Sequence, residues 1–177
     1  REHFEAINQR EAIIFVEDII NNAHPLNEGT IKAIHQLVLK NIDDQGAGIY
    51  RNQNVMISGA SHTPPSFLQL KHLMGALIKE HLEPAGHNNW HPIEKAARLH
   101  TDFVKIHPFI EGNGRTARLL LNLELMRHNY LPVIIRKEDR LAYYQTLDSA
   151  CSQGDYAGFI KQVNDRLIER YHKVLEL

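Results

Sequence analysis

The sequence of 177 residues contains a single cysteine, Cys151, and a single tryptophan. One cysteine excludes a disulfide within the chain and favours a reducing compartment. No apolar run approaches the roughly 18 residues that a membrane-spanning helix needs, and no signal-peptide pattern opens the chain. We therefore expect a cytoplasmic protein that has no membrane partner, and the same features suggest a bacterial source.

The chain also has no excess of charge of either sign. It carries 20 basic and 21 acidic residues, for a formal net charge of −1, which argues against nucleic acid as the main partner. A small basic cluster at Arg127, Arg136, Lys137 and Arg140 is best interpreted as a solvated face. The length suits one domain over residues 1–177. Because the chain begins with arginine, we expect it to be a fragment of a longer protein.

Apolar residues recur at a spacing of three and four along most of the chain, which predicts helices. The predicted helices are 2–23, one capped by Asn27, about 66–84, one from Pro92 to Ile106, about 114–129, about 138–152 and 154–176. The helix at 114–129 is apolar nearly all round, so it should be the central buried one. Residues from His81 to Asn89 are predicted to form a loop. The predicted fold class is all-α, a compact helical bundle.

One stretch, about 48–62, has the alternating texture of strands. Tyr50, Val55, Met56 and Ile57 lie among polar residues and Gly59, which predicts a short β-hairpin. An isolated hairpin is marginal in water, so it should rest on the helices. Its unpaired edge could accept a partner strand.

A glycine-rich loop at 112–114 has the features of a phosphate site. Glycines allow backbone N–H groups to turn toward one point, and a helix is predicted to start at Asn113 or Gly114, where its dipole is positive. Arg115 and Arg118 are three residues apart and should share a face of the first turn. Two cations at a helix N-terminus make sense when an anion lies between them. An ordinary glycine-rich turn with two surface arginines is the alternative.

Two further residues before this loop carry chemistry. His107 can act as a general base, and Glu111 is a hard oxygen ligand of the kind that Mg²⁺ prefers. His100 lies on the apolar stripe of the preceding predicted helix, and a hydrogen-bonded core histidine is its favoured interpretation.

The string HPFIEGNGRTAR at 107–118 resembles the HxFx(D/E)GNGRxxR pattern of the Fic (filamentation induced by cAMP) domain family at every fixed position. The resemblance covers most of the chain. Residues 62–65, His-Thr-Pro-Pro, are similar to the end of the family's flap, and the segment from Tyr130 to Tyr144 is similar to metazoan-type members and related bacterial ones.

The resemblance implies a protein adenylyltransferase, which transfers AMP from ATP to a Ser, Thr or Tyr hydroxyl of a target protein and releases pyrophosphate. His107 would be the base, and Glu111 would hold Mg²⁺. The backbone of Gly112, Asn113 and Gly114 would form the anion hole, and Arg115 and Arg118 would bind the β- and γ-phosphates.

The resemblance also implies roles outside the phosphate loop. Phe109 would point into the core and hold the loop, and Tyr144 would lie against the adenine, although an ordinary core or surface aromatic is an equal alternative for Tyr144. The predicted hairpin, a flap, would dock the target backbone. Its docking residues would be Val55, Met56, Ile57 and His62.

Two departures from the family pattern concern specificity and regulation. Cys151 stands where related members have an asparagine that contacts the nucleoside, so the nucleotide is less defined than phosphate binding. Many members carry an inhibitory helix, (S/T)xxxE(G/N), whose glutamate pairs with the second motif arginine, here Arg118. No glutamate of this chain fits that pattern. We expect the helix upstream of Arg1 or absent, and therefore a de-repressed transferase that cannot remove AMP.

Two alternative functions remain open. A Fic-type domain could transfer another phosphate-containing group, although kinase-like members usually have lysine where this chain has Gly114. A non-catalytic domain could sense nucleotide and bind a partner through the flap, but His107 is present, and its loss is the usual mark of that class.

Overall fold

The computed structural model describes residues 1–82 and 89–176, and within these ranges the chain is helical and contains no strand. The predicted all-α class is confirmed. Two 3₁₀ turns, Phe67–Gln69 and Lys137–Asp139, precede α3 and α6. The α-helices are α1 (Glu2–Asn21), α2 (Glu28–Leu39), α3 (Leu70–His81), α4 (Pro92–Ile106), α5 (Asn113–Arg127), α6 (Arg140–Gln153) and α7 (Ala157–Leu175).

Local sequence signals set several of these helix ends. Asn27 accepts a hydrogen bond from the backbone N–H of Thr30 (3.1 Å), and the Thr30 hydroxyl accepts one from the Asn27 backbone N–H, which is a capping box at the start of α2. Pro92 occupies the first turn of α4. Gly154, with φ 74°, ends α6 in the left-handed conformation and divides it from α7.

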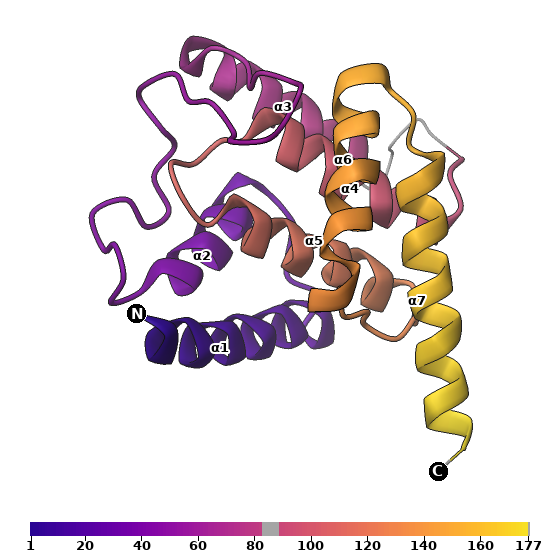
Figure 1. Ribbon diagram of the computed structural model, residues 1–177. Helices are drawn as coiled ribbons and strands as arrows, with labels where there is room; N and C mark the ends of the chain where they lie inside the picture. Colours follow the sequence, from indigo (N-terminus) through magenta and orange to yellow (C-terminus); the bar gives the residue numbers. More distant parts are fainter. Residues whose placement is uncertain (83–88, 177) are drawn as a thin grey trace.

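The fold is organised around α4 and α5, which lie side by side in the middle of the molecule (Figure 1). One buried apolar cluster joins them to α1, α2 and α3, and a second joins them to α6 and α7. The α5 side chains Leu120 and Leu123 face the first cluster, whereas Leu121 and Leu125 face the second. The prediction that this helix is the central buried one is confirmed, because apolar residues all round it are covered on both sides.

The predicted β-hairpin at 48–62 is wrong. These residues form turns and irregular chain without strand pairing, and Met56 is 87% exposed. The apolar run Val55–Ile57 is too short to make a two-stranded sheet that stands by itself. The backbone instead forms hydrogen bonds to other parts of the chain. The Arg51 N–H donates to the Pro108 carbonyl at 2.9 Å, and the Ser61 N–H donates to Asp148 of α6 at 2.7 Å.

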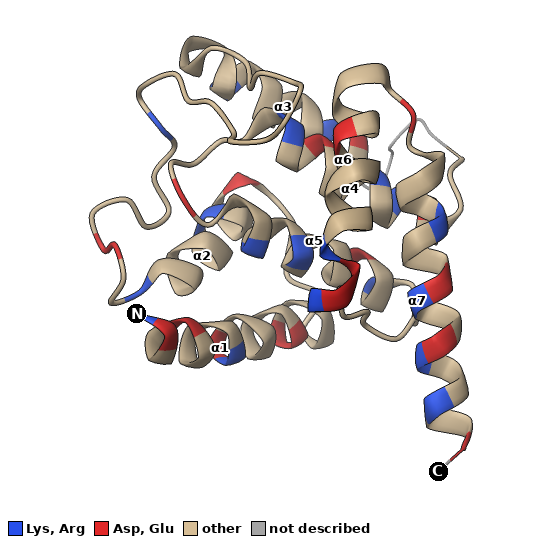
Figure 2. Cartoon of the chain, in the orientation of Figure 1, with Lys and Arg blue, Asp and Glu red and all other residues tan. Residues whose placement is uncertain are grey.

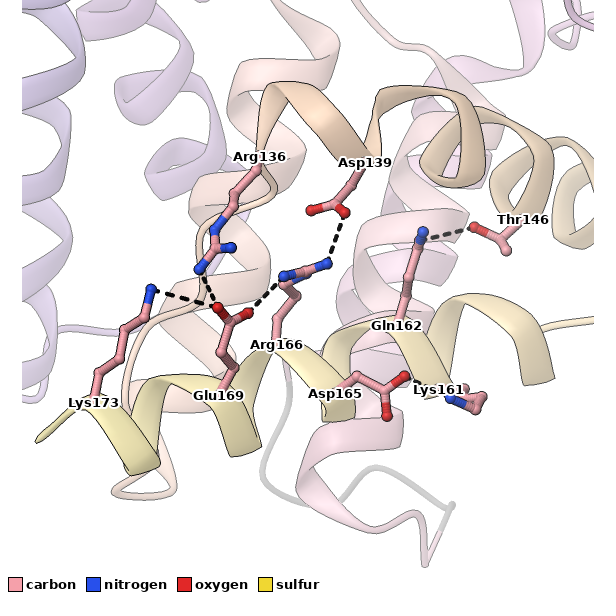
Figure 3. Close-up of polar contacts among 9 residues, drawn as sticks. All are labelled: Arg136, Asp139, Thr146, Lys161, Gln162, Asp165, Arg166, Glu169 and Lys173. Atoms are coloured by element: carbon pink, nitrogen blue, oxygen red, sulfur yellow. Dashed lines mark hydrogen bonds and ion pairs between the residues drawn. The ribbon is translucent and has the colours of Figure 1, made fainter. Parts of the chain in front are cut away.

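Charged side chains fix the last helix to the segment that precedes α6. Figure 2 shows acidic and basic residues interspersed along α7. Arg166 bridges Asp139 (2.6 Å) and Glu169 (2.5 Å), and Glu169 also contacts Arg136 and Lys173 (Figure 3). A network of this kind has more effect than an isolated surface pair.

Two further expectations concern boundaries and membranes. The predicted loop from His81 to Asn89 lies largely outside the described residues, since positions 83–88 are not among them. Within the described part of the chain, no helix is long and apolar enough to cross a membrane.

Candidate active site

His107 lies where the chain turns from α4 into the glycine-rich loop. It has a left-handed conformation (φ 52°) at the C-terminal end of α4, which few residues other than glycine and asparagine adopt. Two residues later Phe109 is fully buried, stacked on the His35 ring with centroids 3.5 Å apart. The buried phenyl ring anchors the loop to α2, as the family resemblance implied for Phe109.

The loop is closed by the side chain of Asn113. Its Oδ1 accepts from the Phe109 N–H at 3.0 Å, and its Nδ2 donates to the Phe109 carbonyl at 2.9 Å. The Asn113 side chain is buried, and both of its polar atoms take part in these two bonds. The backbone of residues 112–114, which starts α5, therefore carries the free N–H groups that could meet an anion.

The two glycines of the loop differ in what the protein itself requires. Gly112 has φ 78°, and a Cβ there would lie 3.0 Å from Nε2 of His35, so the fold demands glycine. Gly114 is helical, and a Cβ would meet only Nη1 of Arg118, at an ordinary 3.6 Å.

His35 of α2 holds the loop through a hydrogen bond to its backbone. Its Nδ1 accepts from the Gly48 N–H at 2.9 Å, so Nε2 carries the proton and donates to the Glu111 carbonyl at 2.9 Å. Burial, and secondarily the charge of Arg115, lower the pKa of His35 to about 4. The ring is therefore neutral near pH 7, as this pair of hydrogen bonds requires.

A cavity of about 440 Å³ opens beside the loop. His107, Gly114 and Arg118 come to it from the motif, and α6 contributes its facing wall. Among the sequence-predicted residues, Ile57, His62 and Tyr144 also line it, while Val55 and Met56 do not. The lining from α6 is Arg140, Tyr143, Tyr144, Leu147, Asp148 and Cys151.

The electrostatics of the cavity keep His107 neutral. Burial lowers the pKa of its imidazole to about 4, and the cation of Arg51 adds to this effect while the Val104 carbonyl opposes it. A neutral imidazole near pH 7 can accept a proton. His100, the neighbour on α4, is fully buried and hydrogen-bonded to the Tyr143 hydroxyl at 3.1 Å, which confirms it as a core histidine.

The two motif arginines have different surroundings. Arg118 lines the cavity and faces Tyr143. Arg115 lies outside the cavity lining, where it contacts Glu5 of α1 (3.5 Å), Glu111 (3.8 Å) and the Val38 carbonyl (3.5 Å). The Glu111 carboxylate is partly exposed and also pairs with Arg1.

The segment 57–62 is held across one side of the cavity by α6. The Ser61 N–H and hydroxyl both donate to the Asp148 carboxylate. These hydrogen bonds lower the pKa of Asp148 below its ordinary value of 3.8. The segment thus reaches the site without a β-sheet.

Among the residues that sequence reasoning did not assign to the site, four hold the loop or the 57–62 segment in place: His35, Arg51, Ser61 and Asp148. Periodicity assigned no role in the site to any of them, because each acts through a contact with a distant segment. A histidine on the apolar stripe of α2 and an arginine after Tyr50 were the available hints, since buried polar residues require partners.

Fold and site together define a class: a domain, helical in its described residues, in which a glycine-rich helix N-terminus and a neutral histidine lie beside a cavity of about 440 Å³. The chain belongs to the Fic/DOC family, whose model matches residues 25–125.

Similar proteins agree with this assignment. The chain is 40% identical to a protein adenylyltransferase Fic from Nematostella vectensis over 96% of its length, and 37% identical to one from Drosophila grimshawi over 93%. It spans 40% and 33% of those proteins. Fic-1 (residues 134–508) of C. elegans has a similar structure, with a TM-score of 0.86 at 33% identity, over 99% of this chain and 52% of that one. These relatives are animal proteins and give the expected bacterial source no support.

Proposed function

We propose that this chain is a protein adenylyltransferase, which transfers AMP from ATP to a hydroxyl group of a target protein. The observation that carries the proposal is the cavity in which His107, Gly114 and Arg118 meet residues of the 57–62 segment. The names of the relatives support it, although the chain spans less than half of the curated ones.

His107 serves as the general base. The target hydroxyl oxygen forms a bond to the α-phosphorus of ATP while its proton passes to the His107 imidazole. The bond from the α-phosphorus to the bridging oxygen breaks, and pyrophosphate leaves with that electron pair. The lowered pKa of about 4 supports this role, because the ring is unprotonated at neutral pH, although such a weak base acts mainly by alignment.

Phosphate binding is assigned to the start of α5. The N–H groups of Gly112, Asn113 and Gly114 form the anion hole, and Arg118 reaches the phosphates from within the cavity. Arg115 contributes a second guanidinium, which contacts Glu5 and Glu111 in this structure. At Gly114 the protein leaves room for a Cβ, so the absence of a side chain there serves the ligand.

The residues present suit a Mg²⁺ ion bound largely by substrate. Within the described residues no group of three acidic, histidine or cysteine side chains could hold a metal, and Glu111 offers one partly exposed carboxylate beside the loop. Mg²⁺ in phosphoryl-transfer sites is held in this way, by one or two carboxylates and phosphate oxygens. When bound, the ion offsets negative charge on the leaving pyrophosphate.

The nucleoside end is assigned to α6. Tyr144 is 53% exposed and lines the cavity, where its ring can lie against adenine. Burial raises the pKa of the Cys151 thiol to about 12, so Cys151 presents a neutral, weakly hydrogen-bonding group. Base selectivity should accordingly be modest. Competition of labelled ATP with GTP, CTP and UTP measures it, and a strict ATP preference would contradict the expectation.

Target docking is assigned to the segment with Val55, Met56, Ile57 and His62. Its backbone has no strand partner in the described structure, so an extended target segment can pair with it. Ile57 and His62 line the cavity, which would place the target hydroxyl near His107. No glutamate of residues 1–177 fits the inhibitory pattern that pairs with Arg118. We therefore expect this chain to be active in transfer and inactive in AMP removal.

The test uses ATP labelled at the α- or the γ-phosphate, with Mg²⁺ and lysate proteins. Label on protein from the α-position alone is the expected result. Label from the γ-position alone indicates a kinase-like reaction, and no label with ATP still bound indicates the nucleotide-sensing binding domain. Either of these two results overturns the proposal.

The variant His107→Ala assigns the base. Transfer should fall by at least 100-fold while ATP affinity stays within threefold, because the imidazole acts on the hydroxyl and not on ATP binding. His72→Ala, an exposed histidine on α3, is the matched control and should behave as the wild type. Unchanged transfer in the His107 variant would remove this residue from the mechanism.

A further inference from the structure

Arg51 is a buried arginine whose partners are backbone carbonyls. It is 3% exposed, and within residues 1–82 and 89–176 it makes no ion pair with a carboxylate. A guanidinium group in such a place must be satisfied by hydrogen bonds, because burial of an unpaired cation is costly. Its donors reach four carbonyl oxygens instead.

Those carbonyls belong to three parts of the chain that meet at the active site. Nε donates to the carbonyl of His107 at 2.9 Å, and Nη2 lies 3.4 Å from that of Ile106. Nη1 donates to Gln53 at 2.9 Å, and Nη2 also donates to Pro65 at 2.6 Å. One planar group thus joins the end of α4 to both ends of the 53–65 segment.

The end of α4 is a favourable place for this cation. The last carbonyls of a helix have no partner within it and carry the negative end of the dipole. The Arg51 backbone adds another tie, since its N–H donates to the Pro108 carbonyl at 2.9 Å. The bonds to residues 106, 107 and 108 surround the left-handed turn at His107 (φ 52°) and hold it in place.

We propose that Arg51 is a positioning residue, which fixes the His107 imidazole and the 53–65 segment relative to one another. This inference rests on the proposed function, in which that segment receives the target and His107 takes the proton from its hydroxyl. This role requires the N–H donors of the guanidinium group, which are fixed in one plane. A lysine side chain ends in a single ammonium group, so it cannot present donors in one plane to all three parts of the chain.

The principal variant is Arg51→Lys, with Arg10→Lys, an exposed arginine of α1, as the matched control. We expect kcat to fall at least tenfold and KM for the target to rise, while ATP affinity changes less than threefold. Arg51→Ala should be more severe and should recover part of its rate when methylguanidine is added. Loss of rate only in proportion to the unfolded fraction, or a wild-type rate in the lysine variant, would overturn the proposal.

Two spectroscopic readouts separate this proposal from the proposed function. In ¹⁵N-arginine NMR of the wild-type protein, the Nε–H of Arg51 should exchange slowly with solvent. Fast exchange would show that its hydrogen bond to the His107 carbonyl does not persist in solution. The ring signals of His107 should titrate at a higher pH in Arg51→Lys than in the wild type, and an unchanged titration would count against the coupling. Both experiments keep their meaning even if no AMP transfer is found.

Discussion

At the scale of single residues, the site depends on groups kept neutral or paired by burial. His107 and His35 are both neutral near pH 7, one facing the cavity and the other supporting the loop beneath it. Arg118 and Arg115, three residues apart, are separated in the structure by their neighbours: one meets the cavity and the other meets Glu5. The surroundings of each side chain, more than its type, decide which chemistry it can perform.

The first prediction concerns the pH dependence of transfer. Because the pKa of His107 is lowered from 6.5 to about 4, the imidazole of the free enzyme loses its basic function only below about pH 4. We expect kcat/KM to stay constant between pH 5 and 8 and to decline on the acid side near pH 4. Rates at each pH should be corrected for the folded fraction by circular dichroism. An acid limb near pH 6.5 would contradict the desolvated environment of this ring.

At the scale of elements, the same hydrogen-bonding pattern occurs twice on α5. Asn113 pairs with both backbone groups of Phe109 at the start of the helix. Asn122 pairs with both backbone groups of Val133 in its middle, at 2.9 and 3.0 Å. Each asparagine fixes a piece of irregular chain to the central helix. Only the first of these pieces lies in the active-site loop.

The second prediction compares these two asparagines. Asn113→Ala leaves the N–H and carbonyl of Phe109 without partners in a buried place, which should cost about 2–4 kcal/mol in the free energy of unfolding. Asn122→Ala should destabilise by a similar or smaller amount, measured by urea unfolding. ATP affinity and transfer should fall only in the Asn113 variant. Equal loss of activity in both variants would mean that stability alone explains the effect.

At the scale of the whole molecule, buried histidines connect stability to pH. Burial lowers the pKa values of His35 and His107 to about 4 and that of His100 to about 3. In the unfolded chain each returns to about 6.5. Between pH 6.5 and 4 the unfolded state therefore binds more protons, and the folded state loses stability as pH falls.

The third prediction follows from this difference. Each of the three histidines contributes a slope of about 1.4 kcal/mol per pH unit well below 6.5, so together they approach about 4 kcal/mol per unit. The urea midpoint should fall steadily from pH 6.5 to 4.5. Replacing one of them, as in His100→Gln, should reduce the slope, whereas His3→Gln on the exposed start of α1 should not. A midpoint that does not change over this range would contradict the buried neutral state of these rings.

The sequence by itself determined the helices, the identity of the central one and the active-site loop. Apolar spacing, Asn27, Pro92 and Gly154 are local signals, and the 107–118 string carries its chemistry within twelve neighbouring residues. Tertiary structure alone decided how the 48–62 segment is held, that Arg115 faces α1, and that Arg51 and Asp148 belong to the site. These features are hydrogen bonds and ion pairs between residues as far apart in the chain as Glu5 and Arg115 or Ser61 and Asp148, and no local pattern encodes a contact over such separations.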